Sequence, residues 1–148
     1  MPSRIQLAVA VCSAVFTVGT ALQNFVVVDQ ELVATMMRAA GTAEPEAATF
    51  TFWFRVIGCG YLLGNALGLL VLRSRSRSLW WTVLAVNATQ ALGAILIPPS
   101  MWSAAFDAHG VWGLLPSAVT DGGALVLVAV MLVRFRTQWG RQAVSSRA

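Results

Sequence analysis

Residues 50–97 read FTFWFRVIGCGYLLGNALGLLVLRSRSRSLWWTVLAVNATQALGAILI, and this stretch decides the fold. Two apolar runs, residues 50–72 and 79–97, flank the short polar segment RSRSRS. An α-helix needs about 20 residues to cross roughly 30 Å of hydrocarbon, and both runs have about that length. Because the bilayer core offers no water to the backbone, such runs must pair their own amide groups. We therefore predict two membrane-spanning helices joined by a tight basic turn.

Two further apolar runs, residues 5–28 and 114–133, extend the pattern to four spans. The 148-residue chain is 57% hydrophobic and only 11% charged, whereas a soluble domain has roughly 25% charged residues. The fold class predicted is all-α, a polytopic four-transmembrane-helix bundle. It forms one domain over residues 1–137, followed by a basic tail at residues 138–148. We expect the first span to be retained, because its apolar run is long for a signal peptide.

The arginines predict the orientation of the spans. Eight of the ten arginines fall before span 1, between spans 2 and 3, or after span 4, and five of the six acidic residues fall in the opposite loops. The positive-inside rule then predicts a multi-pass protein of the cell membrane with both termini in the cytoplasm. Tryptophans cluster at both span boundaries, as in aromatic belts. The net charge of +4 is spread over span ends rather than one face, so no nucleic-acid partner is expected.

The two outer loops carry their own signals. Residues 30–40 (QELVATMMRAA) predict a short amphipathic helix on the outer surface, with Gly41 ending it and Pro45 opening the next helix. Residues 98–113 are rich in aromatic side chains and are expected to form a loop ordered against the membrane.

Asp121 is the ionisable residue deepest in a span, and such residues are functional candidates because their burial is costly. Counting ~1.5 Å per residue places it ~20 Å from the cytoplasmic edge. The same count puts other polar groups of the spans into this layer. The hypothesis is a polar cavity open to the outer face. Its catalytic candidates are Asp121, Arg55 and Gln90, and its ligand-binding candidates are Asn87, Cys59, Thr120, Thr17, His109 and Glu31.

Each candidate also has a purely structural reading. Asp121 can cap a local break at Gly122–Gly123, and Arg55 can be an anchor whose charged end reaches the interface. Gln90 and Asn87 can hold helices together through hydrogen bonds worth about 1 kcal/mol each. His109 is a lone loop histidine, and the two cysteines are typical small packing residues.

Small residues recur every four positions in span 2, at Gly60, Gly64 and Gly68. Such a ridge lets helix backbones approach closely. Packing inside one bundle is the favoured interpretation, and homo-oligomerisation through these glycines is the alternative.

Three functions follow, in this order of preference. The first is a pocket for a lipophilic small molecule, with non-redox acid/base chemistry such as isomerisation, cyclisation or epoxide opening; Asp121 would be the acid or base, and Arg55 or Gln90 would polarise an oxygen. The second is an accessory or assembly protein that binds partner helices. The third is a subunit of an oligomeric transporter or channel. No metal site and no cofactor are expected, because no phosphate loop, HExxH or CxxC motif is present.

Residues 54–93 carry a resemblance to a known family. An aromatic-Arg entry at Phe54–Arg55, a glycine-rich second span and a short basic turn together resemble small bacterial four-helix membrane proteins of the DoxX-like kind. The resemblance is confined to these 40 of the 148 residues. It implies the four-helix fold and carries no site residue with it.

Overall fold

The computed structural model describes residues 2–41, 47–74 and 76–145, and every element in these ranges is helical. Four helices are long and apolar enough to cross a membrane: Arg4–Val27, Ala47–Leu72, Arg77–Leu96 and Val111–Arg134. The predicted all-α fold with four spanning helices is therefore confirmed, and the protein is a multi-pass membrane protein by the length and composition of these helices.

Three of the four spans change pitch along their length. The first and the last contain one π-helical segment each, and the second ends in a tighter 3₁₀ turn. The spans are built from α1 (Arg4–Leu22) with η1 (Gln23–Val27), α3 (Ala47–Leu67) with η2 (Gly68–Leu72), α4 (Arg77–Leu96), and α6 (Val111–Ser117) with η3 (Ala118–Gly122) and α7 (Gly123–Ser145). The helix α7 therefore continues through most of the predicted tail.

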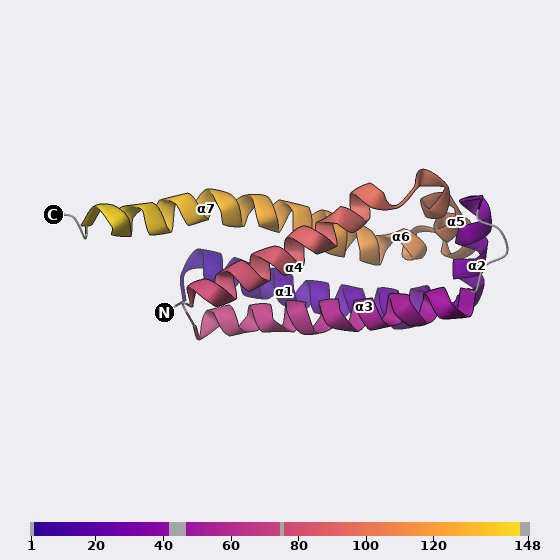
Figure 1. Cartoon of the computed structure of the whole chain (residues 1–148), viewed down its shortest axis with the longest axis horizontal. Helices are drawn as coiled ribbons and strands as arrows, with labels where there is room; N and C mark the ends of the chain where they lie inside the picture. The colour runs from indigo at the N-terminus through magenta and orange to yellow at the C-terminus, as the bar shows by residue number, and fades with distance from the viewer. Residues whose placement is uncertain (1, 42–46, 75, 146–148) are drawn as a thin grey trace.

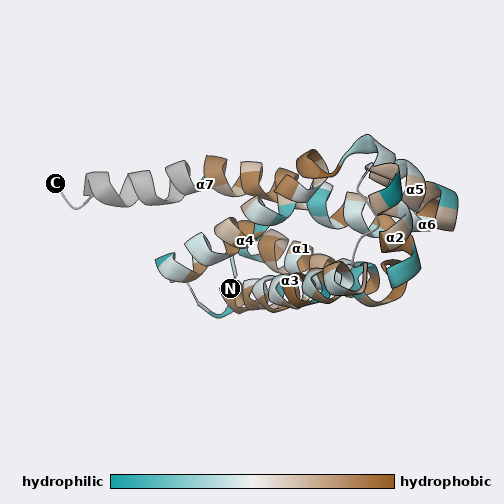
Figure 2. Cartoon of the chain, turned by 45° about the vertical axis from the view of Figure 1, so that its right-hand side comes forward, coloured by the Kyte–Doolittle hydropathy of each residue, from teal (hydrophilic) through white to brown (hydrophobic). Residues whose placement is uncertain are grey.

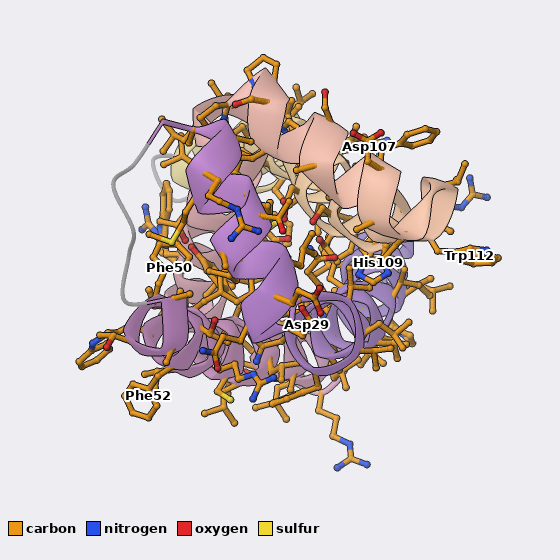
Figure 3. All side chains as sticks on the ribbon, turned by 90° about the vertical axis from the view of Figure 1, so that its right-hand side faces the viewer. Asp29, Phe50, Phe52, Asp107, His109 and Trp112 are labelled. Carbon is orange, nitrogen blue, oxygen red and sulfur yellow. The ribbon has the colours of Figure 1, made fainter. Side chains whose placement is uncertain are left out.

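Two shorter helices, α2 (Gln30–Ala39) and α5 (Pro99–His109), lie across the end of the bundle opposite the two termini (Figure 1). The amphipathic helix predicted at residues 30–40 is thus confirmed, and Gly41, with a φ of 73°, follows it. Pro45 lies outside the described residues. Seen end-on, α2 and α5 cover the bundle while Phe52 and Trp112 point away from it (Figure 3).

The expectation of a loop at residues 98–113 is corrected by the structure, which places α5 and the start of α6 there. The physical reason lies at the two ends of α5. Pro99 is the first residue of the helix, where its missing N–H costs nothing. Gly110 then adopts a φ of 59°, which favours glycine and separates α5 from α6.

The outside of the spans is apolar, and the interior combines apolar with polar side chains. Phe16, Trp80 and Met131 belong to an apolar core, and ten polar residues are buried among the described ones. Leu63 and Leu96 are each 71% exposed, and hydrophobic residues run along all four spans (Figure 2). A protein in water would not expose so many large apolar side chains, whereas lipid solvates them and leaves polar groups to pair internally.

Two of the three glycines of the ridge pack against other helices of the same chain. A Cβ on Gly64 would lie 2.8 Å from a methyl group of Val86 on α4, and one on Gly68 would overlap the hydroxyl of Ser13 on α1. Gly60 is exposed and has no atom within 4 Å of its Cβ position. Two of the three glycines thus support the intramolecular interpretation of the ridge.

Candidate functional site

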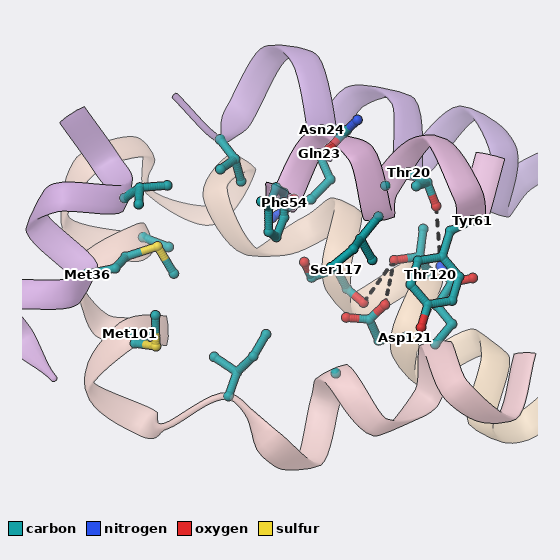
Figure 4. A pocket seen from close by; sticks show the side chains of 18 of the residues that line it. Thr20, Gln23, Asn24, Met36, Phe54, Tyr61, Met101, Ser117, Thr120 and Asp121 are labelled. Atoms are coloured by element: carbon teal, nitrogen blue, oxygen red, sulfur yellow. Dashed lines mark hydrogen bonds between the residues drawn. The ribbon is translucent and has the colours of Figure 1, made fainter. Parts of the chain in front are cut away.

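A cavity of about 260 Å³ lies between the spans and the two covering helices. Its volume is near the lower end of the range of small-molecule pockets, roughly 300–1,000 Å³. Met36 and Met101 lie at the end beneath α2 and α5, and Thr20, Tyr61 and Asp121 lie at the deep end (Figure 4). The polar lining residues are Thr20, Gln23, Asn24, Tyr61, Thr89, Gln90, Ser117, Thr120 and Asp121.

The two π-helical segments deliver polar side chains to this cavity. In η1 the N–H of Val28 donates to the carbonyl of Gln23, five residues back, at 3.0 Å. Such wide turns are rare and recur at functional sites, because they redirect the side chains of one turn. Segment η3 does the same for Thr120 and Asp121. It begins two residues after Pro116, which has no N–H to donate and therefore favours an irregular turn nearby.

The Asp121 carboxylate is half-buried at the deep end of the cavity. The hydroxyl of Thr120 lies 3.1 Å from Asp121 Oδ1. The Thr120 hydroxyl also lies 3.4 Å from the carbonyl oxygen of Ser117. On the other side stands Gly93 of α4, where a Cβ would lie 3.0 Å from Oδ2. The absence of a side chain on Gly93 therefore lets the carboxylate pack closely against α4 on this side.

Beside Asp121, one chain of hydrogen bonds joins three spans. The amide of Asn65 on α3 donates to Gln90 Oε1 on α4 at 2.9 Å, and Gln90 Nε2 donates to the Thr20 hydroxyl on α1 at 3.3 Å (Figure 4 draws the second bond). All three residues are buried. The chain fixes the orientation of Gln90, which is a cavity-lining residue, so it also holds the shape of the deep end.

Asn24 occupies the junction between η1 and α3. It is only 1% exposed, and its Nδ2 donates to the backbone carbonyl of Arg55 at 3.2 Å. Its side chain lies against Gly58, where a Cβ would overlap it. Asn24 Oδ1 and the neighbouring Gln23 Oε1 are buried without a hydrogen-bond partner. Both oxygens are buried in the helix packing, and Asn24 Oδ1 is turned toward Gly58 of α3.

The structure brings together three of the predicted site residues, Asp121, Gln90 and Thr120. Arg55 and Cys59 are exposed and do not line the cavity, which corrects the predicted wall. The reason is helical geometry: the face of α3 toward the cavity carries Phe54, Ile57, Gly58 and Tyr61, which follow the i, i+3, i+4, i+7 pattern of one helix face. Arg55 and Cys59 belong to the neighbouring row.

The other predicted ligand-binding residues also lie away from the cavity. Thr17 donates to the carbonyl of Ser13 within its own helix at 2.8 Å, and buried Asn87 donates to the carbonyl of Val83 at 2.8 Å. His109 and Glu31 are exposed at the covering end. For Asn87 the structure favours the packing role.

Several lining residues were not identified from the sequence. Gln23, Asn24 and Ser117 line the cavity, as do Met36 and Trp102 from the covering helices. The adjacent amides Gln23–Asn24 at the end of an apolar run were an available signal. A rise of ~1.5 Å per residue from Arg4 puts them roughly 30 Å along the span, at its outer boundary, where polar residues are ordinary.

Among the described residues no group of three or more His, Cys, Asp or Glu side chains is arranged to hold a metal ion. No protein-family model, curated protein or solved structure matches the chain. The resemblance of residues 54–93 to DoxX-like proteins stays a prediction. The site is a small, largely apolar cavity with one carboxylate, that of Asp121.

Proposed function

We propose that this protein binds a small lipophilic molecule within the membrane, in the cavity between the spans and the helices α2 and α5. The observation that carries the proposal is the graded lining of the cavity. Apolar side chains such as Met36, Phe54 and Met101 line the covering end, and Thr120 and Asp121 line the deep end. An amphiphile would place its apolar part beneath α2 and α5 and its polar group at Asp121. Ligand pockets generally combine such an apolar wall with a few polar groups that fix orientation.

Binding is better supported than the acid/base reaction. That reaction assigned Arg55 or Gln90 to polarise a substrate oxygen. Arg55 does not line the cavity. The amide of Gln90 is held within the chain by Asn65 and Thr20, so a substrate oxygen would compete with these partners for it. Asp121 can thus contact a ligand, but no second Asp, Glu, Arg or His among the described lining residues is present to assist it in acid/base catalysis.

The proposed orientation follows from the arginines. Both termini and the turn at residues 73–77 would be cytoplasmic, and α2 and α5 would face the outside of the cell membrane. The test uses single cysteines, Ala108→Cys on α5 and Ser78→Cys near the turn, in a chain with Cys12 and Cys59 replaced by alanine. A membrane-impermeant maleimide added to intact cells should label the first and not the second. The opposite labelling would reverse the orientation.

Binding is tested on the full-length protein in dodecylmaltoside with 1-naphthylmethanol as the probe. Equilibrium dialysis should show saturable binding above the partition into empty micelles. Gly93→Val places two methyl groups beside Asp121 and should abolish it. Gly60→Val is the matched control, because Gly60 is exposed on α3 and has open space around its Cβ position.

A folded Gly93→Val protein that still binds the probe as wild type does would refute the proposed cavity. Met36→Trp is a second blocking variant, at the covering end and far from the carboxylate. It keeps the test decisive if Gly93→Val does not fold.

A further inference from the structure

We infer that the cavity selects a cation, and specifically a small lipophilic amine in its protonated form. This inference rests on the proposed function and names the ligand class of the same site. It starts from the charges around the cavity. Among the described residues that line the cavity, Asp121 is the single Asp, Glu, Arg or His side chain.

The carboxylate lacks a counter-charge within the described part of the chain. Its side-chain hydrogen-bond donors, Thr120 and Gln90, are both neutral. A carboxylate removed from water is costly unless a cation or several donors compensate it. An ammonium group of a ligand in the cavity, placed against the carboxylate, would supply both the charge and up to three N–H donors.

The charge of Asp121 also disfavours an anionic ligand. A carboxylate or phosphate would bring acceptors and a like charge to this end of the cavity, whereas an ammonium group brings N–H donors. The amide oxygens Gln23 Oε1 and Asn24 Oδ1 lack a donor, but both atoms are buried in the helix packing, so the preference rests on the carboxylate.

The aromatic rings of the cavity add a third observation. Phe50, Phe54, Tyr61 and Trp102 all line it, and Tyr61 lies at the same end as Asp121 (Figure 4). A cation near the face of an aromatic ring gains about 0.5–2 kcal/mol, depending on desolvation. The same rings contact the apolar part of an amphiphile. Charge, donors and rings thus converge on a compact aromatic or aliphatic amine that fits within about 260 Å³.

The experiment compares three probes that share one ring system: 1-naphthylmethylamine, 1-naphthylmethanol and 1-naphthylacetic acid. Equilibrium dialysis against the full-length protein in dodecylmaltoside, at neutral pH, gives a Kd for each. We expect the amine to bind about tenfold more tightly than the alcohol, equivalent to about 1.4 kcal/mol. The acid should show no saturable binding.

Two variants assign the preference to the carboxylate. Asp121→Asn should bring the amine and the alcohol to the same Kd, and Asp121→Glu should retain the preference for the amine. Asp107→Asn is the matched control, because Asp107 is exposed on α5 and does not line the cavity.

The outcomes separate this inference from the proposed function. If the alcohol binds as tightly as the amine to wild type, and Gly93→Val abolishes both, the cation preference is wrong and the lipophilic pocket stands. If the amine preference persists in Asp121→Asn, the inference is also wrong. If none of the three probes binds saturably, both the inference and the proposed function are overturned.

Discussion

Alanine substitutions at the three ridge glycines should have effects of different sign. An alanine in a helix interior is favoured over glycine by about 1 kcal/mol. At Gly60 nothing lies within 4 Å of the new Cβ, so Gly60→Ala should raise the free energy of unfolding by up to ~1 kcal/mol. At Gly68 the new Cβ would overlap the buried hydroxyl of Ser13. Overpacking costs typically 1–3 kcal/mol, so Gly68→Ala should lower that free energy by about 1–2 kcal/mol after the propensity gain.

Gly64 is the intermediate case. Its Cβ would lie 2.8 Å and 2.9 Å from the two methyl groups of Val86, which is half-buried. Because these contacts are less close than the overlap at Gly68, Gly64→Ala should change stability by less than Gly68→Ala, on the order of 1 kcal/mol or below. Gly64→Leu, whose larger side chain does not fit beside Val86, should destabilise the protein clearly.

The contact of Gly68 with Ser13 allows a rescue. The hydroxyl of Ser13 is buried without a hydrogen-bond partner, so removing it leaves no other group unpaired. Ser13→Gly should consequently restore much of the stability lost in Gly68→Ala, and the double-mutant cycle should show a coupling of 0.5–3 kcal/mol, as roughly expected for residues in contact.

The assay is equilibrium unfolding of the purified protein in mixed micelles of dodecylmaltoside and SDS, followed by far-UV circular dichroism. The reasoning is refuted if Gly60→Ala is as destabilising as Gly68→Ala. That result would mean that the exposed side of the ridge packs against another molecule. Size-exclusion chromatography of Gly60→Ala against wild type would then show a change in oligomeric state.

Two further predictions concern the hydrogen bonds. Gln90→Met removes both bonds of the chain and leaves buried polar groups of Asn65 and Thr20 unpaired, so it should lower the free energy of unfolding by about 1–3 kcal/mol in the same assay; a neutral effect would show that water replaces the amide. Asp29→Ala removes the acceptor that Leu32 N–H reaches at 2.7 Å, which caps α2, and should cost about 1 kcal/mol locally. Hydrogen exchange should then quicken in α2 and stay unchanged in α4, whereas equal protection in α2 would contradict the role of the cap.

The spans could be predicted from sequence because hydropathy and length determine them. The short helix at residues 30–40 could also be predicted, since it combines amphipathic spacing with a terminal glycine. The face that each span turns toward the interior of the bundle could not be predicted from sequence. Helix α3 is apolar on nearly all sides, so no polar face indicates which row turns inward, and Arg55 was assigned to the cavity while Phe54 was not.

The polar layer was predicted in part for a related reason. Counting a constant rise per residue identified the level of Asp121 and Gln90 correctly, and both line the cavity. It could not identify Asn24, because the π-helical turn of η1 changes the direction of side chains without changing hydropathy. Nor could it show that residues 98–113 cover the bundle as a helix, since that depends on contacts between α2 and α5.

The wide turn at Ala118–Gly122 makes the last span tolerant of a change in chain length at this one place. A π-helical turn accommodates one residue more than an α-helical turn does. Deleting a single residue there would let the span continue as an uninterrupted α-helix, so the protein would still cross the bilayer. A deletion within a regular α-helix rotates one flank relative to the other by about 100°, the angle of one helical residue. A one-codon deletion in the π turn would instead leave the two halves of the span facing the same neighbours, and only the side chains of the turn itself would be redirected.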